Sequence, residues 1–275
     1  MWRGWHKLPG GDETFDRLAN IPSSFPTSSC DGEIELFGAT GEQLFAKVVD
    51  NAFPVTFYDS IVAAAELKGF EPALLNQGSG QQEKGISMTN IRSSHRCVMD
   101  DILLSNKLWL IVKQHLPSRD VVPGKRYKGW IATGVNPRFR ILKYSPGERF
   151  EMHQDGSYHF DAKNAGEIEQ QSFMTLQLYL NDGGGIEFTG GSTRFIEPMK
   201  SIRCTSSPTV VMSNSKQIDY DLNNIDIAKV YDVVPLSGRL LLFQHNCWHE
   251  GEMVTSGIKY VLRSEVMYSR EYSSV

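Results

Sequence analysis

The chain has 275 residues, a length that suits one large domain or a catalytic domain with a supporting layer. Apolar residues make up 40% of the sequence and charged residues 22%, which is ordinary for a globular protein that folds without a partner. The formal charge of −4 and the pI near 6.0 argue against a nucleic-acid partner, because nucleic-acid binders carry a basic surface.

No apolar run approaches the roughly 20 residues that span a bilayer, and the first residues lack the apolar core of a signal peptide. We therefore expect a soluble, cytoplasmic protein that has no membrane partner. The cysteines are scattered singly with no CxxC pair, which indicates reduced thiols and no zinc site.

Residues 1–50 are rich in Gly, Ser, Thr and Pro, and we expect an extension that packs on the main domain. Within it, residues 34–38 and 43–49 flank a turn-like segment and predict a hairpin. The remaining residues, 51–275, are expected to form a single domain.

Two helices are predicted in the segment 51–130, which we expect to support the core. The first covers residues 54–69, with Pro54 in its first turn, helical spacing of alanines, and Gly69 as its stop. The second follows the acidic residue Asp101 and runs until Pro117 ends it. Its Trp109 and Leu110 are interpreted as core residues that pack against a sheet.

Short segments of strand-like alternation follow, at residues 139–144, 172–181, 238–243 and 259–268. Helices first and many short strands afterwards predict an α+β fold with a double-stranded β-helix core, that is a jelly roll of the cupin-like kind, over residues 131–275. A polar stretch at about 196–231 interrupts the strand pattern and indicates an insertion, either a lid over a site or a decoration.

His153 and Asp155 are two residues apart after a predicted strand, where alternation directs both side chains to one face. A second histidine far along the chain, either His245 or His249, would complete a set of two imidazoles and one carboxylate. Such a set holds Fe(II) and leaves open positions for chemistry, although it also holds Mn or Zn. Each of these histidines could instead be a core residue with its ring bonded to the backbone.

In this order of motifs the sequence resembles the prolyl 4-hydroxylase-like 2-oxoglutarate and Fe(II) oxygenases over most of residues 51–275. The motifs that carry the resemblance are Tyr144 with Pro146-Gly147, His153 and Asp155, Tyr179-Leu180-Asn181, Gly183 to Gly185, Gly238-Arg239, His249, and Lys259. The family's basic residue lies about ten positions after its distal histidine, which selects His249 over His245 as the third ligand.

The resemblance implies a 2-oxoglutarate site in which Lys259 meets the distal carboxylate of the co-substrate, and in which Tyr144 and Tyr179 donate hydrogen bonds to it. Arg263 shares strand parity with Lys259, so it could replace that lysine, add a second contact, or pair with Glu187 or Glu265. Thr175 and Gln177 lie on the same strand face as Tyr179 and are weaker candidates for contacting 2-oxoglutarate. Any of these residues could instead be an ordinary core residue.

The resemblance also implies the activity of a dioxygenase of the oxidoreductase class, which takes Fe(II), O2 and 2-oxoglutarate, with ascorbate as an optional reductant. Hydroxylation of an unactivated C–H bond, with release of succinate and CO2, is the expected outcome. The substrate is expected to be a peptide or protein, or a small metabolite or free amino acid. An alternative of another class is an inactive jelly-roll binding module, which the intact triad and Lys259 disfavour.

Overall fold

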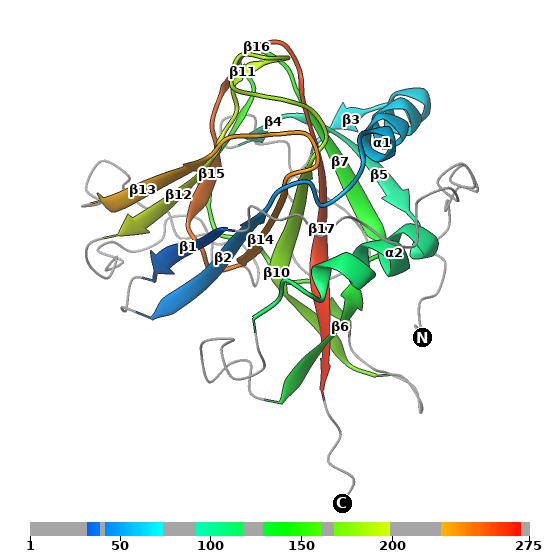
Figure 1. Cartoon of the computed structure of the whole chain (residues 1–275), viewed down its shortest axis with the longest axis vertical. Coiled ribbons are helices and arrows are strands. Elements are labelled where there is room, and N and C mark those ends of the chain that lie inside the picture. The colour runs from blue at the N-terminus through cyan, green and yellow to red at the C-terminus, as the bar shows by residue number, and fades with distance from the viewer. Residues whose placement is uncertain are drawn as a thin grey trace, which may run out of the picture.

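The computed structural model describes residues 32–38, 42–73, 92–117, 129–160, 168–198 and 227–270. Within these residues two sheets face each other and two helices, α1 (Val55–Lys68) and α2 (Ile102–Val112), lie against the outer side of the larger sheet (Figure 1). The arrangement is a jelly roll with helical support, so the predicted fold class is confirmed. No helix in these ranges is long and apolar enough to cross a membrane.

The larger sheet has ten strands and runs through the middle of the molecule. In spatial order its main path is β1 (Gly32–Phe37), β2 (Gln43–Val49), β14 (Leu240–Gln244), β10 (Gln170–Tyr179), β17 (Lys259–Arg270), β7 (Arg138–Tyr144), β5 (His95–Asp100) and β3 (Glu71–Pro72). Two further strands pair off this path, β6 (Trp130–Val135) with β17 and β9 (His159–Phe160) with β10.

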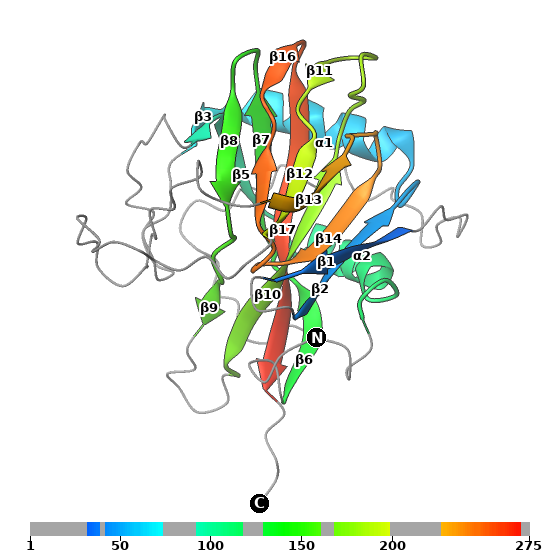
Figure 2. The same ribbon diagram turned by 90° about the vertical axis from the view of Figure 1, so that its left-hand side faces the viewer.

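The smaller sheet has five strands and stands in front of the larger one in Figure 2. Its order is β13 (Ile227–Val233), β12 (Thr193–Pro198), β15 (His249–Gly251), β8 (Arg149–His153) and β4 (Arg92–Ser93). A separate two-stranded ladder joins β11 (Thr189–Gly190) to β16 (Val254–Ser256). The two sheets enclose the space in which the candidate site lies.

Alternation along the strands divides the apolar residues between two cores. On β17, Leu262 and Val266 face the helices, whereas Val261 faces the smaller sheet. On β14, Leu240 and Leu242 likewise face the helices. One face of the larger sheet is therefore committed to helix packing, and the opposite face is left for the interior of the jelly roll.

The predicted helices are present, with one difference at the end of the second. The first ends at Gly69, whose backbone has a φ of 95°. The second begins with the Asp101 side chain accepting a hydrogen bond from the backbone N–H of Leu104, as expected for a helix N-terminus. It ends at Val112, several residues before Pro117, because the backbone N–H groups of residues 114 and 115 already bond three residues back in a turn.

The interpretation of Leu110 as a core residue is wrong. Its side chain is 49% exposed, whereas Trp109 is partly buried against the helix–sheet core. The hairpin predicted near the N-terminus is present as the antiparallel pair β1 and β2, and β2 extends the larger sheet by pairing with β14. Most of the stretch at 196–231, from residue 199 to 226, lies outside the described residues, as do residues 1–31.

Replacing Leu108 by Ala tests the helix–sheet core. Leu108 lies on α2 and is fully buried, so the change should lower the free energy of unfolding by about 2–5 kcal/mol through lost burial and a residual cavity. Leu110→Ala on the same helix is the matched control and should cost well under about 1 kcal/mol, since half of that side chain is in water. Urea unfolding measures both, and equal losses would contradict this packing.

Candidate metal centre

Two imidazoles lie side by side on neighbouring strands of the smaller sheet. His249 on β15 is paired directly with His153 on β8, and the ring centroids are 4.3 Å apart. Nδ1 of His153 lies 2.7 Å from the backbone oxygen of Glu151, and Nδ1 of His249 lies 3.0 Å from that of Cys247. A proton on each Nδ1 can be donated to these carbonyls, which leaves both Nε2 atoms with a free lone pair.

The third member, Asp155, lies just beyond the end of β8. Strand β8 ends at His153, and the backbone N–H of Asp155 donates to the backbone oxygen of His245 at 2.9 Å. Its carboxylate oxygens lie 3.5 Å from Nε2 of His153 and 3.7 Å from Nε2 of His249. The three side chains thus present ligand atoms that all lie within 4.8 Å of one another.

This donor set fits a divalent iron ion. Nε2 of His153 is buried and has no hydrogen-bond partner among the described residues, so a lone pair points into the cluster. Burial and the neighbouring His153 lower the pKa of His249 to about 3, which keeps that imidazole neutral, as a metal ligand must be. Two neutral imidazoles and one carboxylate form the ligand set that suits Fe(II) with open coordination positions.

The carboxylate is held by two further side chains. Thr175 Oγ1 donates to one oxygen of Asp155 at 2.5 Å, and Arg263 Nη2 lies 2.5 Å from the other. Burial raises the pKa of Asp155, but the charge of Arg263 and the nearby imidazoles outweigh it and hold the pKa well below its usual range. An ionised carboxylate has about four lone-pair sites, so it can accept these bonds and still bind a metal.

Arg263 forms its ion pair with Asp155. Of the three roles considered for it, the pair with Glu187 or Glu265 is not formed among the described residues. Glu265 is bonded to Arg140 at 2.7 Å, and Glu187 is exposed. Burial opposes ionisation of Arg263, yet the charge of Asp155 raises the pKa of the guanidinium overall. Arg263 therefore neutralises the carboxylate of the cluster.

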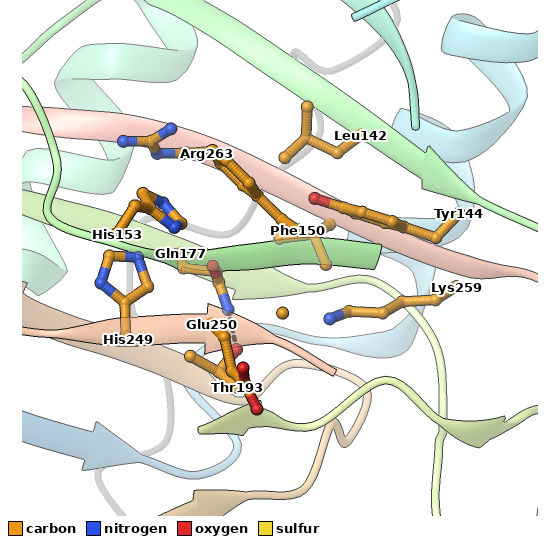
Figure 3. A pocket seen from close by; sticks show the side chains of 12 residues that line it. Leu142, Tyr144, Phe150, His153, Gln177, Thr193, His249, Glu250, Lys259 and Arg263 are labelled. Carbon is orange, nitrogen blue, oxygen red and sulfur yellow. Dashed lines mark hydrogen bonds between the residues drawn. The ribbon is translucent and has the colours of Figure 1, made fainter. Parts of the chain in front are cut away.

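Lys259 lies at the opposite end of the pocket from the two imidazoles (Figure 3). It is buried, and its ammonium donates to the backbone oxygen of Gly191 at 2.6 Å. Its nitrogen is 5.3 Å from the centre of the Tyr144 ring and 5.6 Å from that of Tyr179. Burial lowers the pKa of Lys259 to about 7, and the charge of Glu252 offsets only part of that effect.

The polar side chains between the two ends form a chain of hydrogen bonds. The Tyr179 hydroxyl donates to Thr193 Oγ1 at 2.7 Å, and Gln177 Nε2 donates to the same oxygen at 2.8 Å. Burial raises the pKa of the Tyr179 phenol. Thr193 was not predictable from the sequence, because only the register of β12 brings it to the site. Thr175 binds Asp155 and does not face Lys259.

The cavity itself is small, about 30 Å³. The residues that line it are Leu142, Tyr144, Phe150, His153, Gln177, Thr193, His249, Glu250, Gly251, Lys259, Val261 and Arg263. The cavity is partly open to solvent.

The sequence model of the 2OG-Fe(II) oxygenase superfamily matches residues 139–264. That region contains the imidazole pair, the carboxylate, Lys259 and Arg263. No curated protein sequence matches the chain.

Solved structures with a similar fold include the following three. A viral collagen prolyl hydroxylase from Paramecium bursaria Chlorella virus-1 is 16% identical, with 81% of this chain and 95% of that chain covered and a TM-score of 0.45. A prolyl-4-hydroxylase from Pseudomonas putida is 14% identical, with 82% and 93% covered and a TM-score of 0.47. HygX from Streptomyces hygroscopicus, solved with nickel, 2-oxoglutarate and hygromycin B, is 14% identical, with 82% and 83% covered and a TM-score of 0.45.

Residues 139–264 therefore carry the sequence pattern of the 2OG-Fe(II) oxygenase superfamily, and the protein is an oxidoreductase of the dioxygenase type. This confirms the family expected from the motifs, together with Fe(II) and 2-oxoglutarate as cofactor and co-substrate.

A pH dependence of 2-oxoglutarate binding tests the state of Lys259. In the free protein the ammonium is fully protonated only below its pKa of about 7, and a bound carboxylate would raise that pKa. Affinity for 2-oxoglutarate should therefore be constant below pH 7 and fall by up to about tenfold per pH unit above it. Lys259→Arg stays charged and should lose this dependence in titration calorimetry; a flat profile in the unaltered protein would contradict the assignment.

Proposed function

We propose that this protein is an Fe(II)- and 2-oxoglutarate-dependent hydroxylase that acts on an unactivated C–H bond and releases succinate and CO2. The observation that carries the proposal is the convergence of His153, Asp155 and His249, whose ligand atoms lie within 4.8 Å of one another at a pocket lined by both histidines. In this proposal these three residues are the iron ligands, and His245 holds Asp155 through its backbone oxygen.

The residues around the cluster would fix the ligands before the metal arrives. Backbone carbonyls orient both imidazoles, and Thr175 orients the carboxylate of Asp155. Such outer contacts set ring tautomers and ligand orientation in metal enzymes. The Phe150 ring stacks on His153 at 3.6 Å between ring centroids and shields that side of the imidazole from water.

Lys259 is assigned to the distal carboxylate of 2-oxoglutarate. It is a buried cation at a fixed distance from the imidazole pair, and an anion would replace the water that the ammonium has lost. Tyr144, directly paired with Lys259 across β7 and β17, is assigned to the same subsite as a hydrogen-bond donor. Tyr179 is assigned there too, and its hydroxyl would exchange its bond to Thr193 Oγ1 for one to 2-oxoglutarate. Iron, when bound, supplies the site at which O2 and 2-oxoglutarate react to oxidise the substrate.

The substrate is proposed to be a peptide or a small molecule, and the charged inner face of the larger sheet favours a small charged one.

The test is anaerobic addition of Fe(II) and 2-oxoglutarate to the full chain, followed by air. The expected results are a metal-to-ligand charge-transfer band in visible absorption and then release of succinate. Asp155→Ala should lose both, because two imidazoles alone hold the metal weakly. Asp155→Asn preserves the shape of the side chain beside Arg263, so it distinguishes loss of a metal ligand from unfolding. Asp59→Ala, on the exposed side of α1, is the control and should keep both the band and succinate release.

If the folded, unaltered protein gives no band and releases no succinate, the inactive binding module is favoured. A band that survives in Asp155→Ala would remove that residue from the ligand set.

A further inference from the structure

Several arginines share the interior with the candidate metal centre, on the side away from Lys259. Arg263 on β17 is paired directly with Arg140 on β7, and Arg96 on β5 is paired with Leu142, which lines the pocket. Directly paired residues of antiparallel strands have their side chains on the same face. These arginines therefore belong to the face of the larger sheet that looks into the jelly roll.

Arg92 reaches the same group from the smaller sheet. It lies on β4, opposite Phe150 of β8, and its guanidinium carbon is 4.8 Å from the centre of the Phe150 ring. That ring stacks on the imidazole of His153, so Arg92 lies one ring away from a proposed iron ligand. Its proximity to Arg263 and Arg140 is also evident in its pKa, which burial lowers and the charges of those arginines lower further.

The guanidinium of Arg92 is buried with part of its donor capacity unused. The residue is 8% exposed, and its Nε donates to Ser94 Oγ at 3.1 Å. Its Nη2 is buried and has no hydrogen-bond partner in the described part of the chain. Leaving a charged donor in this state costs stability, because the water it has lost is not replaced.

The carboxylates near these arginines already form ion pairs. Asp155 is paired with Arg263, and Glu265 is paired with Arg140 and also accepts from Asn136 at 2.9 Å. Among the described residues no carboxylate forms an ion pair with Arg92. If Asp155 binds iron, less of its charge remains to offset the arginines, and the need for another anion increases.

We propose that the substrate of this oxygenase carries an oxyanion, a carboxylate or a phosphate, which Arg92 binds beside the metal centre with Arg140 and Arg263 in support. A guanidinium suits this task, since its planar fork of donors matches two oxygens of either group. The inference rests on the proposed function and deepens it. It places the oxidised C–H bond close to an anionic group and favours a small acid over a neutral proline within a peptide.

Two anion subsites at opposite ends of one pocket would also separate the two ligands. Arg263 lines the same pocket as Lys259 and lies at the end where the two imidazoles are (Figure 3). Arg92 lies against the ring of Phe150, which also lines the pocket. Lys259 would take the co-substrate at one end, and the arginines would take the oxyanion of the substrate near the other. The buried position of Arg92 means that the anionic group must be compact.

The experiment measures stabilisation of the full chain, saturated with Mn(II) and 2-oxoglutarate, by propionate, by methyl phosphate and by their uncharged control propionamide. Ligands that bind only the folded state raise the thermal midpoint with concentration, and the shifts give dissociation constants. We expect propionate or methyl phosphate to bind on the order of tenfold or more tightly than propionamide. The tighter of the two anions identifies the substrate's charged group.

Arg92→Met should remove the preference for the anion and should raise the midpoint of the ligand-free protein, because a strained cation is gone. Arg149→Met is the matched control and should change neither, since Arg149 is 49% exposed and bonds to Glu151 at its surface. If Arg92→Met does not fold, Arg92→Lys should keep the charge but weaken the preference, because an ammonium lacks the fork.

Equal binding of the anions and propionamide, or an unchanged preference in Arg92→Met, would overturn the proposal. Binding of 2-oxoglutarate is measured first in the same protein. If 2-oxoglutarate does not bind, the proposed function is contradicted. The anion preference does not depend on turnover, so in that case it is measured without 2-oxoglutarate. Failure of the proposed function and failure of the anion site are therefore distinguishable.

Discussion

The direct pairing of His249 with His153 is the constraint on which the site depends. Their strands, β15 and β8, are neighbours in the smaller sheet, so the backbone ladder itself fixes the separation of the two imidazoles. Asp155 then needs only to follow the end of β8 to meet them, and the backbone oxygen of His245 holds it there. A register slip of one residue in this pair would turn one imidazole away from the other and dissolve the cluster.

The site also requires that the two faces of the larger sheet differ, one packing against the helices and the other lining the pocket. Strand β17 directs Leu262 and Val266 to the helices and Lys259 and Arg263 to the pocket, because successive side chains alternate between faces. The apolar face supplies the burial that makes the fold stable, and the charged face lies in the space that this burial creates. Charges so placed are deprived of water, which lowers the pKa of Lys259 and strengthens the contact of Arg263 with Asp155.

The sequence predicted those features that depend on local pattern. Both helices, the main strands and the spacing that separates His249 from His245 follow from periodicity, breakers and motif order. The partner of Arg263 could not be predicted, because strand parity tells which face a side chain lies on but not which residue it meets there. Leu110 was misjudged for a related reason: helical spacing alone does not say which flank of an apolar stripe the sheet covers.

Contacts between distant strands were beyond the reach of the sequence. Arg92 lies on a strand of two residues that has no alternation to detect, and it meets Phe150 only because β4 pairs with β8. Thr193 on β12 accepts a hydrogen bond from the hydroxyl of Tyr179 on β10, which belongs to the other sheet. Residues that meet only through pairing of distant strands determine which substrate a pocket of this fold accepts. Sequence motifs therefore predict the metal better than they predict the substrate.

The most direct test of this account is a crystal structure of the full chain grown without oxygen in the presence of Mn(II) and 2-oxoglutarate. The account predicts one metal ion bound by Nε2 of His153, Nε2 of His249 and a carboxylate oxygen of Asp155, with the distal carboxylate of 2-oxoglutarate on the ammonium of Lys259. A metal bound elsewhere, or the distal carboxylate seated on Arg263, would contradict it.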